Sequence, residues 1–207
     1  MSLSMISIEK ILGGRTLILG DVNTGKTTLT RNLLEELCRR RLGDQVAVLD
    51  MAPDIPADIA AEKGLTGVGG KLKPPEGCGV LYLGGPFAPP RLSSKTETEA
   101  REKARCNRRR IEILLRRLDR RPREILLIND VSIALQAGTA QSLIRRLERA
   151  ETVVANGYWG ERLGGGALTV REQAEMGKLK TYFEKTGQVL VLERRFITHP
   201  SRKETRQ

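Results

Sequence analysis

The residues best suited to chemistry stand near the start of the chain, where glycines, a lysine and a threonine follow a short apolar run. The run covers residues 16–19, and GDVNTGKT follows it, with Gly20, Gly25, Lys26 and Thr27 in the spacing Gly-x-x-x-x-Gly-Lys-Thr. Glycines at these places let consecutive backbone N–H groups close around an anion, and a following helix adds the positive end of its dipole. The spacing predicts a loop that binds the phosphates of a nucleoside triphosphate.

Each position of this glycine loop, residues 20–28, has an expected role. Lys26 is expected to reach the β- and γ-phosphate oxygens, and the Thr27 hydroxyl to coordinate Mg²⁺. An ordinary glycine turn before a helix is the alternative, but strand, loop and helix follow in the required order. We therefore expect ATP or GTP with Mg²⁺, and we expect the nucleotide also to contact the other loop residues, Gly20, Asp21, Val22, Asn23, Thr24, Gly25 and Thr28.

Further apolar runs predict the remaining strands. Residues 46–49 end in Asp50, and residues 125–128 end in Asn129 and Asp130. Continuous runs of this kind are typical of strands buried on both faces of a parallel sheet. An aspartate after such a strand is suited to hold Mg²⁺ beside Thr27, so Asp130 is the first choice for a metal ligand. The alternative is an aspartate that only caps a loop.

The alternation of strands with helical patterns predicts one α/β domain over residues 1–197, followed by a polar tail, residues 198–207. We expect a P-loop NTPase fold, with a mostly parallel central sheet of about six strands and helices on both faces. The other strands are expected at residues 80–83, 152–155 and 189–192, and further helices near residues 56–63 and at 96–121, 139–149 and 170–185.

Composition excludes several classes of protein. The chain has 207 residues, 39% of them hydrophobic, and no apolar run long enough for a bilayer. Its first residues do not resemble a signal peptide, so we expect a cytoplasmic protein that does not act at a membrane. Three scattered cysteines disfavour a disulfide framework or a zinc site, and the single histidine, His199, disfavours histidine-based catalysis.

Positive charge is concentrated in one helix. The formal net charge is +11, and residues 101–123 hold eleven basic residues against three acidic ones. A helix that follows a parallel strand runs away from the carboxyl edge where nucleotides bind, so Arg116 to Arg123 should lie far from the glycine loop. We interpret this end of the helix as a solvated face, with a nucleic-acid surface as the alternative.

Two glycine-rich loops, residues 64–79 and 157–166, are suited either to close over the site or to remain ordinary surface loops. In the first, Lys71 and Lys73 are candidate anion contacts. In the second, Tyr158 or Trp159 is suited to stack on a base, and Arg162 to stabilise charge on a transferring phosphoryl group. Asn156, at the end of the fifth strand, is a candidate nucleotide contact.

The absence of certain motifs narrows the class of reaction that we expect. There is no Asn/Thr-Lys-x-Asp guanine-reading motif, and Val131 stands where most motor and transporter ATPases have a water-activating glutamate. Group transfer from a nucleotide is therefore favoured over steady hydrolysis.

Several stretches together resemble the polynucleotide 5′-hydroxyl kinases related to the RNA-processing kinase subunits. They are GDVNTGKTTLTRNLL, VAVLD, VLYLGGPFAPP, ILLINDVSIALQAG and TVVAN, within residues 16–155. The resemblance implies that the 5′ end of RNA or DNA accepts the phosphoryl group. It also implies that Asp50 binds metal beside Asp130 or accepts the proton of the attacking hydroxyl, and that Arg162 is a lid arginine.

Two other functions remain open. Residues 130–138 are similar to a stretch of cobalamin adenosyltransferases, which also have a short P-loop domain. A nucleotide-dependent switch or assembly protein is the other alternative, in which glycine-rich loops become ordered on nucleotide binding. The oligomeric state is not predicted.

Overall fold

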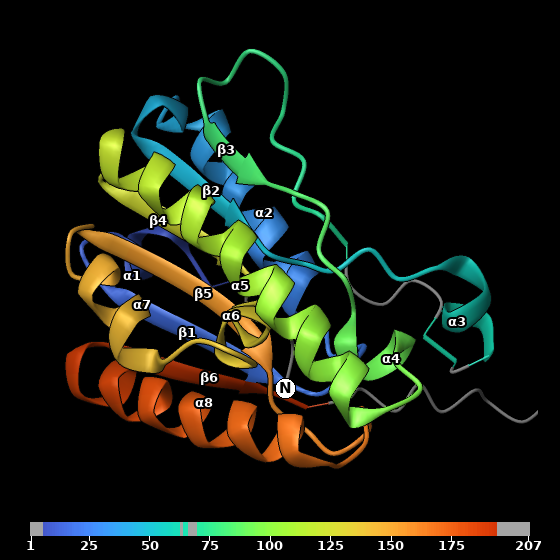
Figure 1. The fold of residues 1–207 in the computed structure, drawn as a ribbon. Coiled ribbons are helices and arrows are strands. Elements are labelled where there is room, and N and C mark those ends of the chain that lie inside the picture. The colour runs from blue at the N-terminus through green and yellow to red at the C-terminus, as the bar shows by residue number, and fades with distance from the viewer. Residues whose placement is uncertain (1–5, 63, 66–69, 194–207) are drawn as a thin grey trace, which may run out of the picture.

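The computed structural model describes residues 6–62, 64–65 and 70–193 (Figure 1). Lys63, residues 66–69 of the loop at 64–79, and the predicted tail with His199 lie outside these residues. Along the chain the structure has α1 (Ile8–Ile11), β1 (Arg15–Gly20), α2 (Lys26–Arg39), a 3₁₀ turn (Gly43–Gln45), β2 (Val46–Asp50), α3 (Ala57–Glu62), β3 (Leu81–Gly84), α4 (Pro90–Ser93), α5 (Glu97–Arg120), β4 (Ile125–Asn129), α6 (Ser132–Leu135), α7 (Ala140–Leu147), β5 (Thr152–Tyr158), α8 (Ala167–Thr186) and β6 (Gln188–Leu192).

The six strands form one sheet in the order β3-β2-β4-β5-β1-β6, and every pairing is parallel. The predicted six-stranded parallel sheet with helices on both faces is therefore confirmed. Strands β1, β2, β4 and β5 are the inner strands and are almost entirely buried, which is why they read as continuous apolar runs.

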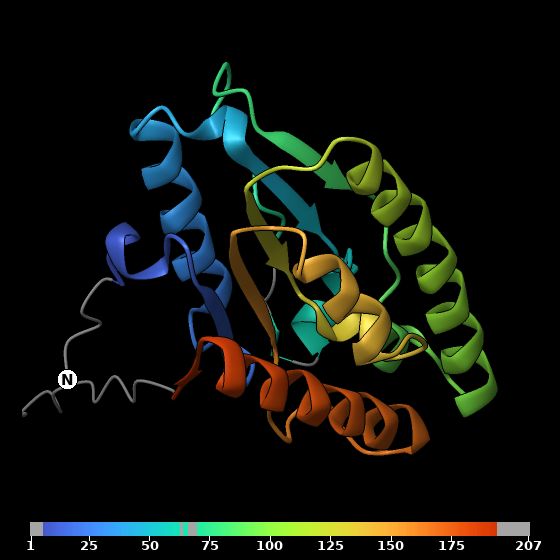
Figure 2. The same ribbon diagram turned by 90° about the vertical axis from the view of Figure 1, so that its left-hand side faces the viewer.

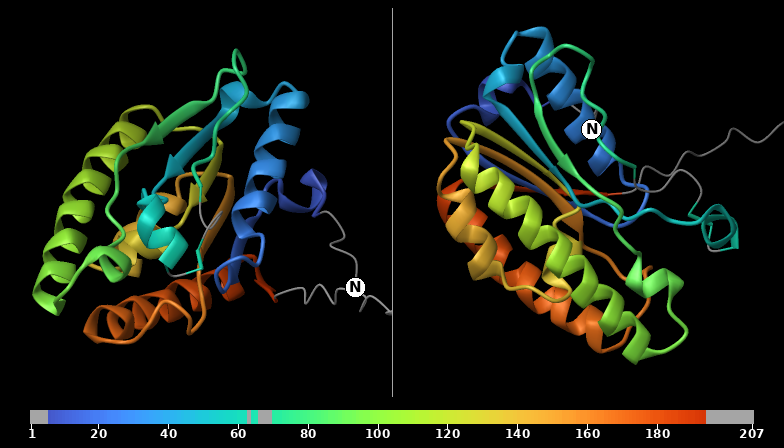
Figure 3. Two further views of the ribbon diagram at one scale, coloured as in Figure 1. Left: turned by 90° about the vertical axis from the view of Figure 1, so that its right-hand side faces the viewer. Right: turned by 45° about the horizontal axis from the view of Figure 1, so that its top comes forward.

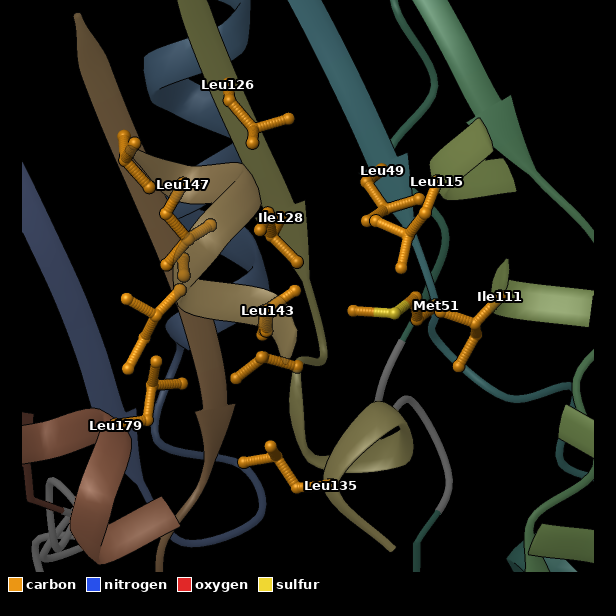
Figure 4. Close-up of a cluster of buried hydrophobic side chains, with 14 of the residues drawn as sticks. Leu49, Met51, Ile111, Leu115, Leu126, Ile128, Leu135, Leu143, Leu147 and Leu179 are labelled. Atoms are coloured by element: carbon orange, nitrogen blue, oxygen red, sulfur yellow. The ribbon is translucent and has the colours of Figure 1, made fainter. Parts of the chain in front are cut away.

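Helices cover both faces of the sheet (Figure 2). Alternate side chains of one strand point to opposite faces, so Leu17 and Leu19 pack with α5, α7 and α8, whereas Ile18 packs with α1 and α2. Figure 4 shows the first of these layers, in which Leu49 and Ile128 of the sheet meet helix side chains such as Leu115 and Leu143. The two layers hold the carboxyl ends of all six strands at one edge.

Three short helices, α1, α4 and α6, were not predicted, and α4 and α6 lie at this carboxyl edge. α3 and α4 extend beyond the strand ends (Figure 3). Short helices leave too few residues for a periodic pattern, so the sequence carries little signal for them. α6 follows Asp130 directly, and α4 precedes the long helix α5.

Helix α5 runs from the carboxyl edge to the opposite edge, where β4 begins (Figure 1). Its buried stripe includes Ala104, Ile111 and Leu118, and also the polar Asn107, whose amide oxygen accepts from the Ala88 N–H and whose amide nitrogen donates to the Ala88 carbonyl. The arginines at its C-terminal end are exposed.

All three cysteines are free thiols, as expected. Cys38 and Cys78 are far apart in sequence but meet in the fold, and burial together with this contact raises the pKa of Cys38 to about 12. No helix within the described residues is both long and apolar enough to span a bilayer.

Candidate functional site

The glycine loop connects the carboxyl end of β1 to the start of α2. Gly25 has φ 89° and Asn23 has φ 61°, left-handed values that glycine and asparagine adopt most readily. Gly20 is needed for a different reason, because a Cβ there would lie 2.6 Å from the Leu192 carbonyl oxygen and 2.7 Å from Thr24 Oγ1. The loop is therefore curled tightly between its neighbours.

The backbone of this loop is rich in unused donors. Among the described residues, the N–H groups of Thr24, Gly25, Lys26 and Thr27 donate to no other protein group. The Lys26 ammonium folds back onto the loop and donates to the Asp21 carbonyl at 2.5 Å. Burial lowers the pKa of Lys26 to about 8, although the charges of Asp130 and Asp21 oppose this effect.

A cavity of about 310 Å³ opens beside the loop. We call it the loop cavity. Its polar wall contains residues 23–28 of the loop together with Arg31, Asn129, Asp130 and Asn156. Its apolar wall comes from segments distant in sequence, among them Ile55, Leu65, Pro90, Leu92, Ile133 and Leu163.

Asp130 faces this cavity from the end of β4. Its φ is 57°, which turns the residue out of the strand, and its Oδ1 is buried without a hydrogen-bond partner among the described residues. Burial raises the pKa of Asp130, while the charge of Lys26 and a hydrogen bond with Ser132 lower it. A buried carboxylate oxygen without a hydrogen-bond partner destabilises the fold unless a ligand binds to it, so Asp130 is suited to bind a cation.

A network of hydrogen bonds between buried amide groups holds Asp130 in place. The Asn156 amide donates to Asn129 Oδ1 at 3.0 Å and to Thr30 Oγ1 at 2.8 Å, and Asn156 Oδ1 accepts from the Asp130 N–H at 2.9 Å. Thr30 in turn donates to the Lys26 carbonyl at 3.0 Å. Asn156 lines the cavity as expected, but its amide groups are engaged with the protein, so it positions the site rather than reading a base.

Asp50 lies at the neighbouring strand end, as expected from the sequence, but its surroundings differ from the expectation. Its carboxylate accepts four hydrogen bonds: from the N–H groups of Ala52 (3.1 Å) and Leu72 (2.6 Å), the Tyr82 hydroxyl (2.9 Å) and the Asn129 amide (2.9 Å). The side chain is fully buried and does not line the loop cavity. Because its acceptor sites are occupied, we assign neither metal binding nor proton transfer to Asp50.

Asp50→Asn should therefore destabilise the fold. Each carboxylate oxygen of Asp50 accepts hydrogen bonds from two donors. In either orientation of the asparagine amide, its NH₂ group therefore faces two other donors and cannot accept from them. We expect a loss of about 2–4 kcal/mol in the free energy of unfolding, measured by urea titration. Asp54→Asn is the matched control: its exposed carboxylate pairs with Lys71, and its removal should cost less than about 1 kcal/mol. Equal stability of the two variants would contradict the anchoring role.

A buried ion pair forms the far wall of the site. Arg91 of α4 donates from Nη2 to Glu172 Oε1 of α8 at 3.1 Å, and its guanidinium carbon lies 4.8 Å from the centre of the Tyr158 ring. The Gln136 amide donates to Glu172 Oε2 at 2.8 Å. Arg91 and Gln136 both line the loop cavity, and Arg91 Nη1 and Gln136 Oε1 are buried without partners in the described structure.

Burial raises the pKa of Glu172 to about 7, although the Arg91 charge and the Gln136 hydrogen bond oppose the shift. A carboxyl with a raised folded-state pKa stabilises the fold at low pH and loses that contribution as pH rises through the folded value. Between pH 4.5 and about 7 this one group should therefore lower the stability by about 3 kcal/mol.

Glu172→Gln should remove the loss of stability that accompanies ionisation of Glu172. The new amide can donate to Gln136 Oε1 if the Gln136 amide flips, so the packing is kept. Urea unfolding of both proteins across this pH range is the measurement. We expect the variant to be the more stable protein above pH 7, with a smaller fall in stability from low pH. Parallel profiles would contradict the assignment.

Most of the other predicted site residues lie outside the loop cavity. Arg162 is exposed and does not line it, and neither does Trp159. Lys71 donates to Asp54 and to the Gly85 carbonyl, and Lys73 is exposed away from the cavity wall. Tyr158 does line the cavity, and its hydroxyl accepts from the Leu163 N–H at 3.0 Å.

The sequence reasoning missed Arg91, Gln136 and Glu172. A signal for Glu172 was present, because it lies on the buried stripe of α8 with Thr169, Met176 and Leu179. An acid on an apolar stripe needs a buried partner. Nothing local in the sequence indicates that Arg91 is this partner.

No protein-family model and no curated protein matches the sequence. Function must therefore be inferred from the geometry of the site.

Proposed function

We propose that the protein binds a nucleoside triphosphate with Mg²⁺ in the loop cavity and transfers its terminal phosphoryl group to an acceptor. One arrangement carries the proposal: free N–H groups of a tightly curled glycine loop and Lys26 line the same cavity as the partnerless Asp130 Oδ1. Such a loop at the start of a helix favours the phosphates of a nucleotide.

The residues present fit a magnesium ion. Thr27 and Asp130 line one cavity and offer oxygen ligands, and the buried Asp130 Oδ1 has no competing partner in the described chain. Mg²⁺ prefers one or two protein oxygens together with phosphate oxygens. When bound, the ion would neutralise charge on the phosphates.

The chain's own residues then have distinct tasks. The loop N–H groups and Lys26 orient the phosphates, and the Arg91 Nη1 group offers a second cation from the opposite wall. Asp130 is the only acidic residue among the described residues that line the loop cavity, and both oxygens of the nearby Glu172 are engaged. This favours transfer to an acceptor over steady hydrolysis. The resemblance to polynucleotide kinases makes the 5′-hydroxyl of a nucleic acid the first acceptor to test.

The test is transfer of radiolabelled γ-phosphate from ATP or GTP, with Mg²⁺, to 5′-hydroxyl RNA and DNA oligonucleotides. The proposal expects a labelled oligonucleotide, and no product with Lys26→Ala. Release of triphosphate that depends on a corrinoid would instead favour adenosyl transfer. Tight nucleotide binding with neither reaction would favour a switch, and no binding would exclude all three functions.

A further inference from the structure

A second cavity, of about 330 Å³, lies between the N-terminal halves of α5 and α8. Arg101, Arg105 and Arg108 of α5 and Arg171 of α8 line it, and we call it the arginine groove. No acidic or aromatic residue of the described chain lines it. The buried side chain of Gln136 borders both this cavity and the loop cavity.

Two of the four guanidinium groups are held in place by the backbone. Arg108 donates from Nη1 to the Ala137 carbonyl, and Arg171 from Nη2 to the Gly138 carbonyl, each at 2.9 Å. Neither forms an ion pair with a carboxylate in the described residues. An arginine has five N–H donors, so each retains donors for a ligand while the carbonyl fixes its orientation.

The other two arginines can exchange their partners for a ligand. Arg101 pairs with Glu97 at 3.1 Å and Arg105 with Glu102 at 3.8 Å, and all four side chains are exposed. Exposed pairs within one helix contribute little to stability, so a stronger anion displaces them at small cost.

The spacing of the arginines along α5 suits a ligand with more than one anionic group. Positions 101, 105 and 108 lie on one face of α5 and span about 10 Å along it, at about 1.5 Å per residue. The groove also includes Ala167 and Leu168, the first residues of α8, where the helix dipole is positive. Planar guanidinium groups bind phosphate oxygens in pairs.

We propose that the arginine groove binds an acceptor that carries two or more linked phosphate groups, and that this acceptor reaches the transferring phosphoryl group past Gln136. The role of this ligand as an acceptor rests on the proposed function, whereas phosphate binding in the groove does not depend on it. The linked phosphates belong either to a single strand of nucleic acid or to a small polyphosphorylated molecule. Without aromatic residues in its lining, the groove should bind a strand with little base preference.

Fluorescence anisotropy with a labelled single-stranded oligothymidylate tests the groove. Two double variants each remove two of the four arginines of the groove: Arg108→Gln with Arg171→Gln, and Arg101→Gln with Arg105→Gln. The second variant leaves the hydrogen bonds to the backbone carbonyls intact. The matched control is Arg116→Gln with Arg120→Gln, which removes the same charge from the exposed far end of α5.

Each groove variant should lower the affinity at least about tenfold. It should also reduce the slope of log affinity against log salt by about 1.4, or 0.7 for each lost contact. The control should change affinity less than about threefold. Unchanged binding in both groove variants, or an equal loss in the control, would overturn the proposal.

Calorimetry with tripolyphosphate on the Lys26→Ala protein identifies the source of the phosphates. Groove-dependent binding of tripolyphosphate without oligonucleotide binding indicates a small acceptor, and binding of neither probe overturns the proposal. ATP affinity of the groove variants is measured in parallel. Groove-dependent oligonucleotide binding in a protein that does not bind ATP would remove the proposed function and leave the phosphate site standing.

Discussion

Arg91→Gln should lower the rate of phosphoryl transfer about 10³-fold while nucleotide affinity stays within several-fold of the original. The Arg91 guanidinium pairs with Glu172 through Nη2, but its buried Nη1 on the wall of the loop cavity has no hydrogen-bond partner among the described residues. An arginine that stabilises a transferring phosphoryl group contributes about 10³-fold or more. On the proposed function, affinity should change little because the loop N–H groups and Lys26 would hold the nucleotide in both proteins.

The fold should tolerate this change. Removing the Arg91 charge lets the pKa of Glu172 rise further above its present value of about 7, so the buried carboxyl becomes neutral instead of remaining as an unpaired charge. Near-ultraviolet circular dichroism and the urea midpoint check this separately from single-turnover rates.

Arg162→Gln is the matched control for Arg91→Gln. Arg162 is exposed and outside the cavity wall, so its replacement should leave the single-turnover rate within about threefold. If Arg162→Gln removed transfer and Arg91→Gln did not, the cation would come from the loop at 157–166 after all.

Asp130→Asn should abolish the dependence of nucleotide binding on Mg²⁺ and lower turnover about 10²-fold or more. The change removes the one buried carboxylate oxygen suited to the ion, and a metal contributes several kcal/mol to a phosphoryl-transfer transition state. Asparagine also tolerates the positive φ of 57° at this position, so the backbone is not strained. Calorimetry of ATP binding with and without Mg²⁺ is the measurement.

Stability separates this effect from misfolding. Burial raises the pKa of Asp130, so its charged form costs stability as pH rises through that value, and asparagine avoids the cost. We expect the variant to lose less stability than the original protein as pH rises, although it has lost function. Thr27→Val should reproduce the loss of Mg²⁺ dependence and Thr27→Ser should not; Mg²⁺-dependent binding that survives Asp130→Asn would refute the metal assignment.

The sequence predicted the elements whose signal is local. Apolar runs located all six strands, and loop spacing located Lys26 and Thr27 beside an aspartate, because each pattern is complete within a few neighbouring residues. The hydrogen bonds of Asp50 could not be predicted, because strand position places a carboxylate at the sheet edge but does not reveal its donors. The N–H groups of Ala52 and Leu72 that occupy Asp50 come from loops with no pattern of their own.

Arg91 could not be predicted for a related reason. It lies on a helix of four residues, and its partner Glu172 is far away in the chain. Glu172 and Asn107 share a signal that can be used elsewhere, since each is a polar residue on a buried helical stripe that bonds a distant segment. Polar positions of this kind predict that a partner exists without saying which residue it is.

The order of strands in the sheet has a consequence for synthesis on the ribosome. β1 carries the glycine loop and is the first strand made, yet its two neighbours, β5 and β6, are the last. At about 5–20 residues per second, the chain from Gly20 to Leu192 takes roughly 10 to 35 s to emerge. Until β5 emerges, β1 has no neighbouring strand to pair with, and its second neighbour β6 follows later, so the nascent chain should gain nucleotide affinity only when its final third is complete.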